Sequence, residues 1–170
     1  MPPPRITIFV PNLEDHPPQR AMVLLANGLH RRGYAVDVAA PMGGGPLRAA
    51  LDPRIGQIDL ARRHAATSVL SLARILAERR PAALLAPDGD AGVAAMAATV
   101  LARKGTALAV LGRRPESPGA MRTLLHRLLP TCALLDLRDG DDSDIVAERC
   151  LAAVGLPGSL VPRGADGDRP

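Results

Sequence analysis

The sequence predicts an α/β fold, with a parallel β-sheet of about six strands that is doubly wound, so that helices cover both faces. Three observations predict it. Short apolar segments alternate with amphipathic helical segments up to about Gly155, which is the order of repeated βα units. The strand segments are continuous apolar runs, as in strands buried on both faces. Glycine or proline follows the helical segments, where helices end. Together these features indicate a Rossmann-like domain.

The first βα unit shows the pattern most clearly. An apolar run over residues 5–11 precedes a helix over 17–32, since proline suits the first helical turn and Gly33 suits the position after the last. Four apolar residues recur at helical spacing and predict the face that packs on the sheet: Met22, Leu25, Ala26 and Leu29. We predict further strands over residues 34–40, 57–60, 82–86, 106–111 and 133–137. The other helices are expected as a short one over 46–51 and longer ones over 67–80, between Asp90 and Gly105, over 120–129 and over 143–154.

The length and the composition limit the possible functions. A chain of 170 residues suits one domain, which we place at residues 1–156, with 157–170 as a linker or disordered tail. Phe9 and Tyr34 are the only aromatic residues, so the core must be aliphatic. Proteins that bind single-stranded nucleic acid stack its bases on aromatic side chains, so we expect no nucleic-acid partner.

The net charge of +4 comes from arginine, since Lys104 is the only lysine. Guanidinium groups favour phosphates and anionic lipid surfaces, although solvated charge at helix ends accounts for pairs such as Arg31 and Arg32 equally well. Residues 122–129 are both basic and apolar, which is typical of a helix that lies on a membrane surface. The chain shows no secretory signal and no apolar run near the ~20 residues of a membrane span. We therefore expect a cytoplasmic protein, with peripheral attachment to the anionic inner membrane as a further hypothesis.

Residues that carry out reactions are scarce. The chain has no G-x-S-x-G or C-x-x-C motif, and Cys132 and Cys150 stand in apolar segments where buried thiols are expected. The glycines at 43–45 lack the lysine and hydroxyl of a phosphate-binding loop. The aspartates between 136 and 144 fit no calcium loop, and no histidine has a ligand neighbour at metal spacing. We therefore predict no metal site.

The candidate site lies where strand-to-helix loops converge at one edge of such a sheet, at residues 12–18, 87–90 and 112–119. Asp88 and Asp90 are weak candidates for a general base, although a turn at Gly89 with Asp90 capping the next helix is the simpler interpretation. The first loop, residues 12–18, can also be interpreted as an ordinary capped turn. The candidates for binding substrate are Asn12, His16, Arg20 and Arg113.

Several segments resemble the N-terminal domain of family 4 glycosyltransferases, which have the two-domain GT-B fold. The stretch PPQRAMVLLANGLHRRGYAVDV is similar to the family's first helix and second strand, with matches at Arg20, Leu25, Ala26, Leu29, Arg32, Gly33 and Val36. GGGPLRAALDPRIGQIDL resembles its G-P-L-R segment, and RRPAALLAPDGDAGVAAMAATVLARKGTALAV parallels its R-P-D-V-V strand and following helix. Residues 128–166 parallel the last helix and the ending P-N-G-x-D, so the resemblance covers nearly the whole chain.

The resemblance implies the acceptor-side half of a sugar transferase, with a donor-binding C-terminal domain or partner subunit holding the nucleotide-sugar and no cofactor tightly bound. The sequence departs from the family in its first loop, where Glu14 to Pro18 replace the glycines and Gln19 replaces an acidic residue. The histidine often found after the fourth or fifth strand is missing, as is the second domain. A non-catalytic binding or assembly module that pairs with another glycosyltransferase subunit therefore remains an alternative, as does another kind of small nucleotide-binding Rossmann protein.

Overall fold

The computed structural model describes residues 1–103, 105–112, 120–129, 132–136 and 142–161. Its six strands form one sheet in the order β3-β2-β1-β4-β5-β6, and every neighbouring pair is parallel. This arrangement confirms the predicted fold class. The strands are β1 (Arg5–Phe9), β2 (Ala35–Ala40), β3 (Gly56–Asp59), β4 (Ala83–Pro87), β5 (Ala107–Leu111) and β6 (Cys132–Leu135).

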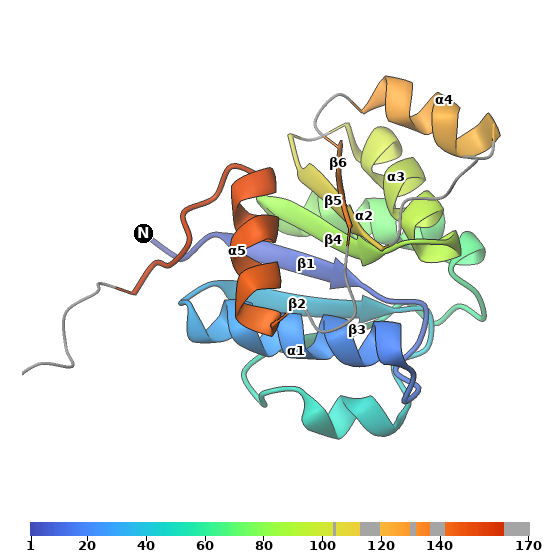
Figure 1. The fold of residues 1–170 in the computed structure, drawn as a ribbon. Helices are drawn as coiled ribbons and strands as arrows, with labels where there is room; N and C mark the ends of the chain where they lie inside the picture. Colours follow the sequence, from blue (N-terminus) through green and yellow to red (C-terminus); the bar gives the residue numbers. More distant parts are fainter. Residues whose placement is uncertain (104, 113–119, 130–131, 137–141, 162–170) are drawn as a thin grey trace, which may run out of the picture.

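The helices divide between the two faces of the sheet (Figure 1). One face carries α1 (Pro17–Arg31), the short 3-10 helix η1 (Pro46–Ala50) and α5 (Ser143–Ala153), whose apolar residues share one core cluster. The other carries α2 (Val69–Arg79), α3 (Asp90–Ala102) and α4 (Ala120–Leu128), with a second cluster. Successive side chains of a strand point to opposite faces, which is why Ile8 belongs to the first cluster and Phe9 to the second.

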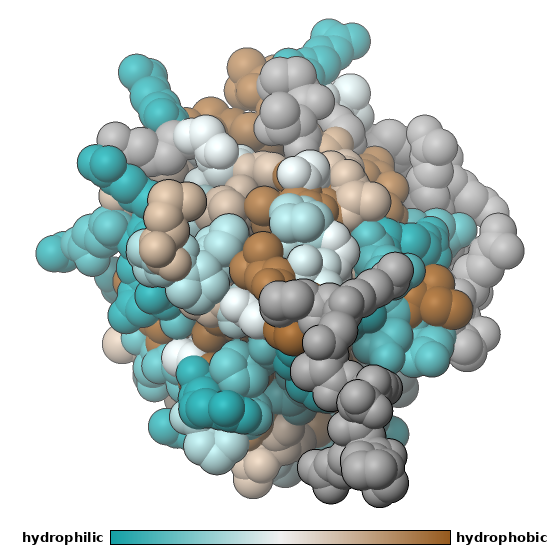
Figure 2. Space-filling view, turned by 90° about the vertical axis from the view of Figure 1, so that its left-hand side faces the viewer, coloured by the Kyte–Doolittle hydropathy of each residue, from teal (hydrophilic) through white to brown (hydrophobic). Residues whose placement is uncertain are grey.

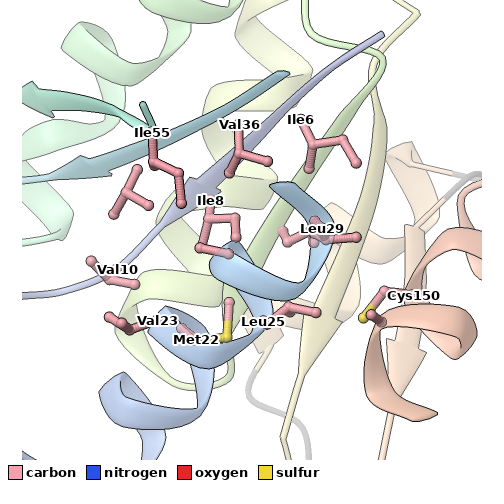
Figure 3. Packing of buried hydrophobic residues seen from close by; sticks show 14 of the residues in the cluster. Ile6, Ile8, Val10, Met22, Val23, Leu25, Leu29, Val36, Ile55 and Cys150 are labelled. Atoms are coloured by element: carbon pink, nitrogen blue, oxygen red, sulfur yellow. The ribbon is translucent and has the colours of Figure 1, made fainter. Parts of the chain in front are cut away.

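The first cluster shows why α1 follows its predicted face (Figure 3). Met22, Leu25 and Leu29 recur at helical spacing and are each at most 1% exposed beneath the sheet. Cys150 of α5 closes the same cluster from the side of β6. Burial raises the pKa of the Cys150 thiol to about 12, so this sulfur stays protonated and behaves as a core residue. Neither cysteine is part of a disulfide.

The ends of several elements differ from the sequence expectations for local physical reasons. The first strand ends at Phe9, two residues before the expected end at Pro11. The Val10 N–H still bonds the Ala39 carbonyl at 3.0 Å, but Pro11 has no N–H with which to continue the ladder. The helix expected over 67–80 begins as a 3-10 turn, η2 (Ala66–Ser68), before α2 proper. There, the Thr67 and Ser68 hydroxyls both bond the His64 carbonyl at 2.9 Å, which tightens the turn.

Residues 156–161 return along the edge of the sheet where the strands begin, the side that Figure 2 views. Leu156 and Leu160 pack against the first cluster, and the Leu160 N–H donates to the Arg32 carbonyl at 2.9 Å. The Tyr34 hydroxyl donates to the Pro157 carbonyl. Leu160 also lies beside Gly33, which has a φ of +93°, and a Cβ added to Gly33 would lie 3.2 Å from Leu160 Cβ, so a side chain there would be strained. The domain boundary that we place after residue 156 stays a prediction.

One further feature lies away from the edge where the strands end. An open groove of about 760 Å³ lies between the end of α1, α5 and residues 158–161, and it is lined by charges of both signs from Arg31, Arg32, Asp144 and Glu148.

Among the helices that the structure describes, none combines the length and the apolar character that crossing a bilayer requires.

Candidate ligand site at the carboxyl edge of the sheet

The topology places one special position in this sheet, between β1 and β4. These strands are neighbours, with Ile6 opposite Ala83 and Ile8 opposite Leu85. Yet the chain leaves β1 for α1 on one face and leaves β4 for α3 on the other (Figure 1). Connections that part in this way leave the carboxyl ends of the two strands open, and open parallel sheets bind ligands at such a switch point. The loops at this point are residues 10–16 and 88–89.

The β1–α1 loop is held by short internal hydrogen bonds. The Asn12 side-chain oxygen accepts the Glu14 N–H at 3.2 Å, and the His16 N–H donates to the Glu14 carbonyl at 2.8 Å. Leu13 is 2% exposed and anchors the loop in the core, while its carbonyl accepts the Leu47 N–H at 3.0 Å. Asn12 therefore shapes the loop, and the imidazole of His16, at the N-cap of α1, makes no capping bond.

Arg20 projects from the first turn of α1 and is already engaged. Its Nε and Nη2 donate to one oxygen of Asp15 at 2.9 and 2.7 Å. Both side chains are more than half exposed, so the pair contributes only about 0–1 kcal/mol to stability. The pair matters more for binding than for stability, because Asp15 offsets the positive charge that Arg20 would offer an anionic ligand.

The start of α1 offers few amide donors. Pro17 and Pro18 occupy its first two positions and have no N–H, and the Arg20 N–H already bonds the His16 carbonyl at 2.9 Å. A helix start that binds phosphate needs several such N–H groups. The third residue of α1 is Gln19, which the sequence marks only as a departure from the family. Gln19 is 8% exposed, and its side-chain oxygen is buried with no hydrogen-bond partner within the described part of the chain.

The β4–α3 loop is short and turns at a glycine. The Asp88 N–H donates to the Leu111 carbonyl at 2.7 Å, which ties the end of β4 to that of β5. Gly89 has a φ of +91° and stands at the N-cap of α3, so the expectation that Asp90 caps this helix is wrong. Asp90 is instead the exposed first residue of α3, where its negative charge suits the positive end of the helix dipole.

Two glycines allow this loop to sit close to β5. A Cβ added to Gly112 would overlap the Cβ of Asp88. The backbone at the end of β5 therefore lies directly against the Asp88 side chain at the end of β4. A Cβ on Gly92 would lie 3.0 Å from Val110 Cγ1 and 3.1 Å from the Pro87 carbonyl oxygen, so α3 packs tightly on both strands. The sequence alone placed Gly112 in a candidate loop but assigned neither glycine a packing role. A glycine directly after a strand, and one in a first helical turn, are signals that could have found them.

The glycines after β2 serve the loop itself. The Asp59 carboxylate accepts the Ala61 N–H at 2.7 Å and the backbone N–H of Gly43, and these bonds lower the pKa of Asp59. Gly45 has a φ of +139°, and a Cβ there would overlap the Leu13 carbonyl. The glycines thus let the β2 loop close on the β1 loop and on the end of β3.

The structure therefore brings five of the six candidate residues to one edge of the sheet. Asn12, His16 and Arg20 come from the β1 side, and Asp88 and Asp90 from the β4 side. Arg113 lies outside the described residues. Within the described part of the chain, no group of three or more histidine, cysteine or carboxylate side chains is placed to hold a metal ion. The functional roles of these candidates stay predictions.

Comparisons with known proteins bear on the fold. No family model and no curated protein matches the sequence. Among solved structures, MurG of Acinetobacter baumannii is similar at a TM-score of 0.55 and 15% identity, over 81% of this chain and 42% of that one. The glycosyltransferase SnogD from Streptomyces nogalater is similar at a TM-score of 0.53 and 17% identity, over 99% of this chain and 55% of that one. MT0777 is similar at a TM-score of 0.53 and 15% identity, over 89% of this chain and 97% of that one.

These likenesses concern the fold alone, because the identities are low. The chain spans about half the length of MurG and SnogD, but it matches nearly the whole length of MT0777. The chain thus shares its fold with about half of MurG and of the glycosyltransferase SnogD, and with nearly the whole of MT0777.

Proposed function

We propose that this chain is the acceptor-side half of a GT-B glycosyltransferase, incomplete without a donor-binding domain or partner subunit. Together they would transfer sugar from a nucleotide-sugar to a glycan or lipid-linked acceptor. The observation that carries the proposal is the open switch point between β1 and β4, in a fold that matches 99% of this chain and 55% of the glycosyltransferase SnogD. The resemblance to the N-terminal domain of family 4 agrees with it.

In this proposal the chain forms one wall of the active site and positions the acceptor. Asn12 and His16 border the acceptor on the β1 side, and Asp88 is the candidate base that takes the proton of the attacking hydroxyl. The donor half holds the nucleotide-sugar and stabilises the departing diphosphate. The few amide donors at the start of α1 support this division, because they make the β1 side a poor diphosphate site.

The first experiment asks whether the chain is half of an enzyme. The purified protein is incubated with UDP-glucose, UDP-N-acetylglucosamine or GDP-mannose and a set of glycoside acceptors, and release of the nucleoside diphosphate is followed. We expect no turnover. Robust transfer by the chain alone would overturn the proposal.

The second experiment adds the donor half, either as a continuation of the reading frame or as a co-expressed subunit. We expect turnover in the assembly, and Asp88→Asn should lower kcat by about 100-fold if Asp88 is the base. Glu14→Gln, in the neighbouring loop, is the matched control and should change kcat little. Absence of transfer from the complete assembly, with every acceptor tested, would count against the proposal.

The alternative function is a non-catalytic binding or assembly module for another glycosyltransferase subunit. The likeness that spans 97% of MT0777 supports it, because a chain of similar size has this fold without a second domain of comparable length. In that case the partner's turnover would rise when this chain is added, and Asp88→Asn would leave the rise unchanged.

We also propose that the protein is cytoplasmic and that α4 attaches it to an anionic membrane surface. Leu125 and Leu129 face the core, whereas Leu124 and Leu128 are 54% and 56% exposed one helical turn apart, beside the exposed Arg127. Sedimentation with phosphatidylglycerol vesicles tests this, with phosphatidylcholine vesicles as the uncharged reference. The double variant Leu124→Ser/Leu128→Ser should lose binding, and Leu70→Ser, another exposed leucine, should not. Equal binding to both kinds of vesicle would remove the electrostatic part of the proposal.

A further inference from the structure

Gln19 is a polar residue in an apolar position. It lies on the sheet-facing side of α1, one turn before Met22 and Val23, which are 1% and 3% exposed. Its own exposure is 8%, and its side-chain oxygen, Oε1, is shielded from solvent without a donor. Leaving an amide oxygen buried and unpaired costs about 1–3 kcal/mol. A side chain of this kind calls for a donor that the described residues do not supply.

The position of Gln19 points to the switch point. It is the last residue of the buried stripe of α1 toward the carboxyl edge, directly after the loop that leaves β1. The terminal amide of glutamine turns about a broad, two-fold torsion. Of the two polar atoms of this amide, only the oxygen is both shielded and unpaired, and a half turn of the amide exchanges its place with the nitrogen while α1 stays in place.

The charges around this position do not suit an anion. Glu14 and Asp15 stand in the β1 loop, and Asp88 and Asp90 stand in or next to the β4 loop. Arg20 is the one arginine that the described residues of these loops and the first turn of α1 contribute, and its guanidinium is taken by Asp15 at 2.7 Å. The prolines at the start of α1 remove two further donors. Oxygen acceptors thus outnumber donors here, which suits a ligand that brings hydroxyl groups.

We infer that Gln19 determines ligand specificity, with its Oε1 accepting a hydrogen bond from a hydroxyl of an uncharged sugar unit at the β1 side of the switch point. The inference rests on the proposed function and names the part of the acceptor that this chain recognises. The ligand class is a neutral polyol, in contrast to a phosphate or diphosphate. A hydroxyl donor satisfies the buried amide oxygen, whereas a phosphate would bring one more acceptor to it.

The test replaces Gln19 by methionine, which keeps the shape of the side chain and removes the amide. The probes are methyl glycosides of glucose, galactose, mannose and N-acetylglucosamine, and inorganic phosphate. Binding is followed by NMR through the amides of Gly89 and the Asn12 side chain. We expect at least one glycoside to shift these signals in a saturable way and phosphate to leave them unchanged. Gln19→Met should weaken glycoside binding roughly fivefold or more.

A second measurement separates recognition from a structural role. Since Gln19→Met removes an unpaired buried oxygen, its thermal midpoint should equal or exceed that of the wild type. Gln57→Met, at an exposed position of β3, is the matched control and should change neither property. Saturable phosphate binding at these amides, no glycoside binding, or equal binding by Gln19→Met would each overturn the inference.

Failure of this inference and failure of the proposed function give different results. Glycoside binding that depends on Gln19, in an assembly that transfers no sugar, would uphold the inference and defeat the glycosyltransferase proposal. Sugar transfer with an unchanged KM for the acceptor in Gln19→Met would do the reverse.

Discussion

The carboxylate of Asp37 accepts a hydrogen bond from Arg5 Nη1 at 2.7 Å, which joins β2 to β1 at the edge of the sheet where both strands begin. Arg79, at the end of α2, donates to the same carboxylate oxygen at 3.2 Å. The Asp37 side chain is 3% exposed, whereas the two arginine side chains are 39% and 44% exposed. One buried charge thus holds two strands and a helix together.

We predict that Asp37→Ala destabilises the protein by about 2–3 kcal/mol, because it removes two charge-assisted hydrogen bonds from a buried position. Arg5→Ala should cost less, about 1 kcal/mol, since Arg79 remains to pair with Asp37. Urea unfolding measures both free energies. A larger loss in Arg5→Ala than in Asp37→Ala would contradict this account of the cluster.

Gly112→Ala should destabilise the protein by about 2 kcal/mol, because a methyl group there overlaps Asp88 and pushes the ends of β4 and β5 apart. Gly44→Ala is the control, since an added Cβ meets no atom within 4 Å at that position. NMR should show the Asp88 amide shifted only in Gly112→Ala. Equal stability of the two variants would mean that the contact between Gly112 and Asp88 is not tight.

Tyr34→Phe should cost about 1 kcal/mol and loosen residues 156–161, because the hydroxyl donates to the Pro157 carbonyl. Hydrogen exchange of the Leu160 amide, which bonds the Arg32 carbonyl, reports the loosening. Burial raises the pKa of Tyr34, so the wild type should lose this contribution as the pH rises above about 10, where the unfolded phenol ionises. The Phe variant should lack that part of the alkaline destabilisation.

Asp52 should titrate far below an ordinary aspartate. Hydrogen bonds from the Arg54 side chain and its N–H, at 3.1 and 2.9 Å, lower the pKa of Asp52 to about 2. A carboxylate with a lowered pKa stabilises the fold above its unfolded pKa near 4, and this stabilisation is lost as the pH falls toward about 2. NMR titration of the side-chain carboxyl measures the value, and Arg54→Gln should raise it toward 3.8. An unchanged pKa in Arg54→Gln would show that another group lowers it.

Local patterns in the sequence determined the elements and the fold class. Continuous apolar runs specified the strands, and apolar residues at helical spacing specified the sheet-facing side of α1, because both depend on burial that repeats within a few residues. Gly33 marked the end of α1 and Gly155 the end of α5 for a similarly local reason, the positive φ that a helix end requires. The convergence of Asn12, His16, Asp88 and Asp90 at one edge also followed, since parallel strands end on the same side.

The neighbours that those residues meet follow from how the elements pack in three dimensions. The strand order β3-β2-β1-β4-β5-β6 places Asp37 between two arginines far away in the sequence and sets Gly112 against Asp88. The packing of α1 on the sheet also buries the side-chain oxygen of Gln19, although the chemistry of a glutamine favours exposure. These contacts join residues distant along the chain, and their geometry depends on how whole elements pack, which no local period in a sequence encodes.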